Sequence, residues 1–139
     1  MLRPPFGGPI CATTANVSDD SRHLLGKMCE NLACAELQRL GYAILAVRYR
    51  TRFGEIDIVA RHEGFTVFVE VKTRMGEDFG GGVDAVTVQK QRRISQMAID
   101  YIARQNEYDT PCRFDVVTID VGDGPPRVEV YPHAFDSAY

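Results

Sequence analysis

The segment from Gly54 to Arg74 constrains the fold most, because two apolar runs are joined there by a short polar turn. The runs, 55–61 and 65–74, are rich in Val, Ile, Thr and Phe, which favour β-strands. Between them lies Glu63-Gly64, a pair that suits a two-residue hairpin turn. The segment therefore predicts an antiparallel hairpin with a buried, mostly apolar surface.

The turn also fixes the expected pairing of the two strands. If the hairpin closes at Glu63-Gly64, His62 opposes Phe65, and each further pair lies one residue outward on both strands. This register predicts two opposed pairs of charged residues, Asp57 with Glu70 and Glu55 with Lys72. Strict alternation places Glu55, Asp57 and Val59 on one face, and Phe68, Glu70 and Lys72 on one face of the next strand.

Further elements surround this hairpin. Helical spacing of apolar residues predicts a helix from Ser21, its expected N-cap, to about Leu40, with Gly41 as its C-terminal cap. A second helix is expected after the N-cap Thr87. The remaining strands are expected at 42–49, 112–121 and 127–131. The order α-β-β-β-α-β-β predicts an α/β fold in which helices flank a mixed β-sheet.

The composition fits a single domain. The chain has 139 residues, of which 45% are hydrophobic, and we expect one domain at 21–139 after a disordered tail at 1–20. No signal-peptide or membrane-spanning run is found, so we expect a cytoplasmic protein with no membrane partner. The four cysteines lack the paired spacing of a zinc site.

The net charge of −3 argues against a protein that coats nucleic acid by electrostatic attraction. However, the charge is unevenly distributed: residues 1–47, 48–104 and 105–139 carry net charges of 0, +2 and −5. The acidity therefore belongs to the C-terminal segment. The balance does not exclude nucleic acid, and it favours selective or metal-dependent binding over tight general binding.

The expected pairing of Asp57 with Glu70 is chemically informative. Like charges directly opposed on a sheet repel, unless a cation lies between them. Oxygen-only clusters suit Mg²⁺ or Mn²⁺, and Glu30 offers a third carboxylate from the preceding helix. A lysine such as Lys72 can stabilise charge that develops on a phosphoryl group. The alternative is a solvated outer face, where a Glu55–Lys72 ion pair contributes less than about 1 kcal/mol.

These residues resemble a known nuclease motif. Asp57 followed by Glu70-Val71-Lys72 is similar to the core motif of the PD-(D/E)xK nuclease superfamily. The wider sequence resembles the bacterial YraN family in these segments: Gly26 to Glu30, Leu40-Gly41-Tyr42, Tyr49 to Asp57, Phe68-Val69-Glu70-Val71-Lys72, Val86-Thr87 with Lys90, and Arg113-Phe114-Asp115-Val116.

The resemblance runs from about Gly26 to Phe135, nearly all of the expected domain. Two positions depart from the family pattern. Arg48 stands where an Asn is usual before Tyr-Arg, and His133 stands where an Asn is usual before Ala-Phe. Neither departure affects the motif residues.

The resemblance implies a restriction-endonuclease-like fold and a metal-dependent endonuclease similar to Holliday junction resolvases. It implies that Asp57, Glu70 and the backbone carbonyl of Val71 bind Mg²⁺ or Mn²⁺. Lys72 would steady the attacking water or the developing phosphorane charge. Glu30 would bind the metal through water or belong to a second metal site.

Other residues have more open assignments. Glu55 pairs with Lys72, assists the metal or only holds the hairpin. The expected nucleic-acid contacts are cations in two groups, Arg48, Arg50 and Arg52 on one strand face and Lys90, Arg92 and Arg93 at the start of the second helix. Each of these cations can equally be a solubilising surface residue.

Three functions remain open at this level. The first is an endonuclease whose partner is DNA, with branched or junction DNA as the expected substrate and a homodimer if paired cuts are made. The second is a noncatalytic nucleic-acid-binding module that keeps the nuclease fold. The third is a protein-interaction domain whose acidic surface meets another protein.

Overall fold

The computed structural model describes residues 14–76 and 86–138. Residues 1–13, with most of the expected tail, and the glycine-rich stretch at 77–85 lie outside this description. The element order matches the predicted one: α1 (Thr14–Arg39), β1 (Ala43–Thr51), β2 (Gly54–His62), β3 (Phe65–Met75), α2 (Val88–Gln105), β4 (Cys112–Val121) and β5 (Arg127–Phe135).

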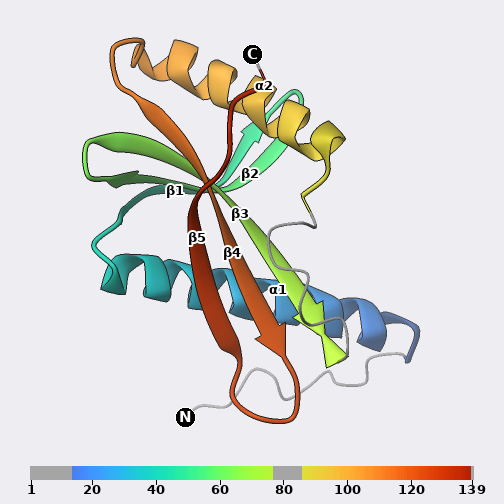
Figure 1. Ribbon diagram of the computed structural model, residues 1–139. Helices are drawn as coiled ribbons and strands as arrows, with labels where there is room; N and C mark the ends of the chain where they lie inside the picture. Colours follow the sequence, from blue (N-terminus) through green and yellow to red (C-terminus); the bar gives the residue numbers. More distant parts are fainter. Residues whose placement is uncertain (1–13, 77–85, 139) are drawn as a thin grey trace, which may run out of the picture.

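The strands form one mixed sheet in the order β1-β2-β3-β4-β5, which confirms the predicted α/β class. Only β3 and β4 run parallel, because α2 connects them; the other neighbours are antiparallel. The two helices cover opposite faces of this sheet (Figure 1). The α1 face buries Leu37, Val69 and Val117, and the α2 face buries Phe68 and Met97.

The observed ends of the two helices can be compared with those predicted from local sequence signals. The backbone N–H groups of Gly41 and Tyr42 donate to Gln38 and Leu37, so Gly41 ends α1 as predicted. Thr87 caps α2 as predicted, because its side chain accepts a hydrogen bond from the Lys90 N–H. The predicted start at Ser21 is wrong, because α1 begins at Thr14. The added stretch, residues 14–20, contains no Pro or Gly that would end the helix.

Neither helix in the described ranges is long and apolar enough to cross a membrane.

The predicted hairpin register is confirmed over its inner part. The pairs run without a shift from His62 opposite Phe65 to Ile58 opposite Val69, and the regular pairing of β2 with β3 ends there. The two outer pairs predicted from this register, Asp57 with Glu70 and Glu55 with Lys72, lie beyond that end.

Strict alternation also fails at this point of β2. Ile56 and Val59 both pack in the α2 cluster, although they are three residues apart, while Ile58 packs in the α1 cluster. The neighbouring strand is irregular as well, because Arg48 has a left-handed backbone with φ of 56°. The alternation of β2 is therefore interrupted at Asp57, and its neighbours Ile56 and Ile58 pack on opposite faces of the sheet.

Candidate active site

Asp57 lies where β2 leaves β3. Its carboxylate oxygen Oδ2 accepts a hydrogen bond of 2.8 Å from the Val71 N–H, a donor that a continued strand pairing would have used. Burial raises the pKa of Asp57 to about 6, and the negative charge of Glu70 adds to this increase. The Val71 hydrogen bond and the charge of Lys90 oppose the increase in part. The structure thus brings the two predicted carboxylates into electrostatic contact.

Glu70 forms an ion pair with Lys90, which the sequence pattern does not predict. The ammonium group of Lys90 lies 3.1 Å from Glu70 Oε2, and the Glu70 side chain is only 13% exposed. Lys90 stands in the first turn of α2, held there by the Thr87 cap. The sequence predicts Lys90 as a nucleic-acid contact, whereas in the structure its ammonium group pairs with Glu70. The N-cap Thr87 three residues earlier indicates that Lys90 lies in the first turn of α2, but not which side chain it meets.

Glu30 reaches the neighbourhood of Asp57 from α1. Its charge contributes to the raised pKa of Asp57, although less than that of Glu70. Its Oε2 atom lies 3.0 Å from Arg48 Nε, so the Glu30 carboxylate forms an ion pair with an arginine of β1. Sequence reasoning missed this pair, because it depends on the irregular backbone of Arg48.

Lys72 and Glu55 do not form the predicted cross-strand pair. Lys72 is half-buried on β3 and stands opposite Thr118 of β4 in the parallel pairing. Glu55 faces Arg50 of β1, and its carboxylate lies 2.9 Å from the Arg50 guanidinium. Both side chains of that pair are well exposed, so it contributes less than about 1 kcal/mol. Glu55 thus forms an exposed ion pair across the β1–β2 hairpin, and a role beside the metal stays a prediction.

The carboxylates near Asp57 fit a divalent cation only in part. Within residues 14–76 and 86–138, no three His, Cys, Asp or Glu side chains are grouped closely enough to share a metal ion. Glu30 is thus not brought into one cluster with Asp57 and Glu70. The two remaining carboxylates offer only oxygen donors, which suits Mg²⁺ or Mn²⁺. Their mutual repulsion, expressed in the pKa of Asp57, is what a bound cation would relieve.

The three arginines predicted to share a strand face have different surroundings. Arg48 pairs with Glu30 of α1 and Arg50 pairs with Glu55, whereas Arg52 lies in the β1–β2 turn beside Phe53. Their contact with nucleic acid stays a prediction. Arg92 and Arg93 are exposed on α2, as expected for cations at its start.

A buried polar network on the α1 side was not foreseen. Arg113 forms a two-point ion pair with Asp115, and the Tyr42 hydroxyl donates to Asp115 over 2.5 Å. Burial and the Asp115 carboxylate raise the pKa of Tyr42, so its hydroxyl stays protonated. His62 stacks on Tyr42 and bonds to Arg113. The network ties the end of α1 to β4, and the charges of Arg113 and Asp115 within an apolar strand were its only sequence signal.

Comparisons with known proteins were made for the whole chain. Residues 29–119 match the family described as "Uncharacterised protein family UPF0102". A UPF0102 protein of Geobacter metallireducens is 46% identical over 115 residues, covering 83% of this chain and 94% of its own. Relatives in Symbiobacterium thermophilum and Pseudomonas aeruginosa are 45% and 38% identical, covering 80% and 81% of this chain and 95% and 92% of their own. The chain therefore belongs to the YraN-like family UPF0102.

Proposed function

We propose that this protein is a metal-dependent endonuclease that hydrolyses phosphodiester bonds in DNA, with branched or junction DNA as its preferred substrate. One observation carries the proposal: Asp57 and Glu70 meet where β2 leaves β3, close enough that the charge of Glu70 raises the pKa of Asp57. The resemblance of these residues to the PD-(D/E)xK motif supports the same reaction, as does the α/β order of the elements. On this proposal the fold is restriction-endonuclease-like.

The cation is Mg²⁺ or Mn²⁺, and the residues that would hold it are Asp57, Glu70 and the carbonyl of Val71. When bound, the cation supplies the polarisation of water and of a phosphoryl oxygen that phosphodiester hydrolysis needs. Asp57 is held in place by the Val71 N–H, so its free oxygen has a defined direction. Glu30 would join through water once it exchanges its contact with Arg48.

The lysines have separate proposed roles. Lys72 follows Glu70 by two residues on the same strand, and we assign it to the attacking water or to the charge that develops on the phosphoryl group. Lys90 lies on the Glu70 carboxylate and offsets the repulsion between Glu70 and Asp57 before a metal binds. Lys90 would therefore be a positioning residue.

The proposal is tested by incubating the purified protein with linear, flapped and four-way DNA in Mg²⁺ or Mn²⁺. We expect cleavage by the wild type, highest on the branched substrates, and at least about a hundredfold less by Asp57→Ala and Lys72→Ala. Asp123→Asn, which changes one charge at an exposed position of the turn between β4 and β5, is the matched control and should cleave as the wild type does. Equal cleavage by wild type and Asp57→Ala would refute the proposal.

A noncatalytic nucleic-acid-binding module is the second candidate. It is favoured by the Lys90 ammonium on Glu70, because an internal cation already balances part of the acidic pair. DNA binding that weakens with salt but needs no metal, together with no cleavage in either metal, would favour this function. A homodimer is expected only if paired cuts at a junction are made.

A further inference from the structure

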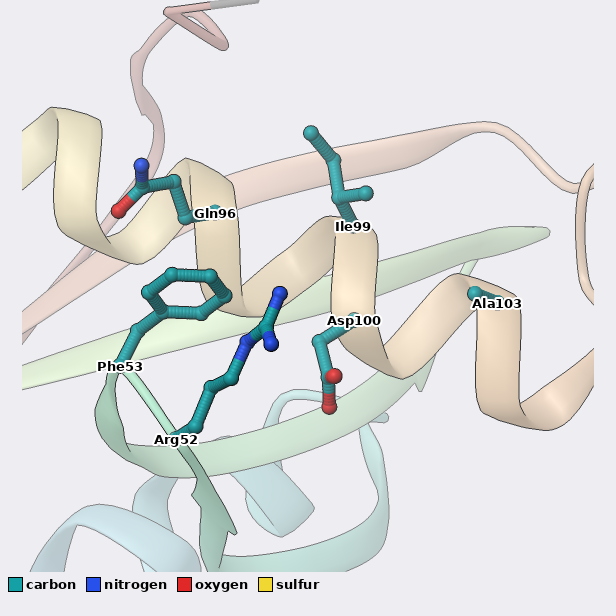
Figure 2. A pocket seen from close by; sticks show the side chains of 6 residues that line it. All are labelled: Arg52, Phe53, Gln96, Ile99, Asp100 and Ala103. Carbon is teal, nitrogen blue, oxygen red and sulfur yellow. The ribbon is translucent and has the colours of Figure 1, made fainter.

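A hollow of about 280 Å³ lies between the β1–β2 turn and the outer side of α2 (Figure 2). The turn provides Arg52 and Phe53 to its wall, and α2 provides Gln96, Ile99, Asp100 and Ala103. The two elements meet closely behind it, at Gly54. A Cβ atom at Gly54 would lie 3.5 Å from the Met97 sulfur and 3.8 Å from Arg93 Cδ. At this point the turn and α2 are therefore separated by about the width of one methyl group.

We propose that this hollow receives an unpaired base of the DNA substrate. The inference rests on the proposed function for the identity of the ligand, and it specifies why branched DNA would be preferred. Phe53 offers an aromatic ring, and the Arg52 guanidinium lies 5.1 Å from the centre of that ring. Ile99 adds an apolar wall, since its side chain is 51% exposed despite its size. Flat apolar and guanidinium surfaces of this kind stack on bases irrespective of sequence.

The charges around the hollow favour a nucleotide over an apolar peptide. Within the described residues, Arg52 forms no ion pair, so its charge is free to meet a phosphate. The one carboxylate in the wall, Asp100, is held by Arg104 at 2.9 Å. The Gln96 amide offers both a donor and an acceptor, as the edge of a base requires. An apolar side chain would use none of these groups.

The position suits a base near the proposed cleavage site. Arg52 and Asp57 are five residues apart on the β1–β2 hairpin, which limits their separation to roughly 17 Å at about 3.3 Å per residue. That span corresponds to about five nucleotide steps at roughly 3.4 Å each. A base inside a duplex remains stacked and paired, so only a flap, junction or single strand offers one to this hollow without an unstacking cost.

The test uses DNA flaps that carry one 2-aminopurine in the unpaired segment, without metal so that nothing is cleaved. We expect the wild type to quench 2-aminopurine emission and to bind the flap at least about fivefold more tightly than a blunt duplex. Ala103→Leu, which narrows the hollow, should abolish the quenching and the preference. Ala35→Leu, at an exposed position of α1, is the matched control and should retain both.

A second pair of variants tests the charge. Arg52→Gln should weaken flap binding at least about threefold, whereas Arg127→Gln on the opposite edge strand should not. Unchanged emission, or the same quenching by Ala103→Leu and wild type, would overturn the inference. If emission is unchanged while cleavage still depends on Asp57, only the inference fails and the proposed function stands. If no DNA is bound without metal, the inference fails, and the cleavage assay in Mg²⁺ or Mn²⁺ decides the proposed function separately.

Discussion

Asp57 is the residue at which stability and proposed function oppose each other. Its pKa in the folded protein is raised from 3.8 to about 6, chiefly by burial and then by Glu70. A carboxyl whose pKa is higher in the folded state stabilises the fold when protonated. That contribution is complete below about pH 4 and is lost as the pH rises through 6. At neutral pH the ionised carboxylate therefore destabilises the metal-free protein.

This conclusion predicts that Asp57→Asn stabilises the metal-free protein. Asparagine keeps an oxygen that can accept the Val71 N–H, and it removes the buried charge. We expect the free energy of unfolding in urea to rise by about 1–2 kcal/mol at pH 8, and to change little at pH 4. Asp123→Asn, the surface control, should show no such pH-dependent gain. A less stable Asp57→Asn at pH 8 would contradict the account.

Two departures from the family pattern have a common physical basis. Arg48 and His133, which replace the usual asparagines, both have left-handed backbones with φ of 56° and 53°. Asparagine and histidine are enriched in this conformation, whereas arginine is not. The pattern therefore reflects backbone geometry at these positions. Arg48 accepts the strained backbone and gains the contact with Glu30.

The strain at Arg48 can be measured by comparing substitutions. Arg48→Asn and Arg48→Ala both lose the Glu30 contact, so their difference reports the backbone alone. We expect the asparagine variant to be more stable to urea by about 1 kcal/mol. At Arg50, which lacks a positive φ, the same two variants should agree within about 0.5 kcal/mol. An equal difference at both positions would exclude strain at Arg48 as its cause.

At the scale of the elements, the features predicted correctly are those with local causes. Gly41 ends α1 because it adopts a positive φ. Glu63 and Gly64 also have positive φ angles, which suit a two-residue turn, and this turn sets the register of the hairpin. The end of that register at Asp57 has no local cause. It depends on β1 and on the contact of the β1–β2 turn with α2, which sequence patterns do not encode.

Gly54 tests the backbone of the β1–β2 turn. It has φ of 132°, so Gly54→Ala introduces backbone strain, whereas the added Cβ would lie at ordinary van der Waals distances from Met97 and Arg93. We expect it to lower the free energy of unfolding by about 2 kcal/mol. Gly26→Ala in α1 has open space and a helical backbone, so it should raise stability by about 0.5–1 kcal/mol. Similar effects at the two glycines would contradict this description of the turn.

For the whole molecule, the sequence indicated two carboxylates that lie near each other in the structure, but it missed the cations that accompany them. The local hairpin register predicted that Asp57 and Glu70 are neighbours, although the regular pairing ends one residue pair before them. The ion pairs of Lys90 and Arg48 were not predictable, because their positions depend on how α2 and β1 pack against the sheet. Of these two ion pairs, only Arg48–Glu30 lowers the net charge of +2 in residues 48–104, because Glu70 is already counted in that sum and Glu30 is not.

We therefore expect DNA binding to involve few phosphates. In metal-free buffer, the logarithm of the association constant should fall with the logarithm of salt concentration with a slope of about −3. Arg93→Gln should reduce the steepness by about one unit, because Arg93 is exposed beside the turn. Fluorescence anisotropy at several salt concentrations measures both slopes. A slope near zero, or no change in Arg93→Gln, would show that these cations do not contact the backbone.

The most direct measurement is the titration of Mn²⁺ into the protein, followed by electron paramagnetic resonance of the free ion. We expect the wild type to bind at least one Mn²⁺ per chain at pH 7.5, in competition with Mg²⁺, and to release it as the pH falls through 6. Asp57→Asn should lose this binding, and Asp123→Asn should keep it. Equal Mn²⁺ binding by wild type and Asp57→Asn would contradict the claim that Asp57 and Glu70 form the metal site.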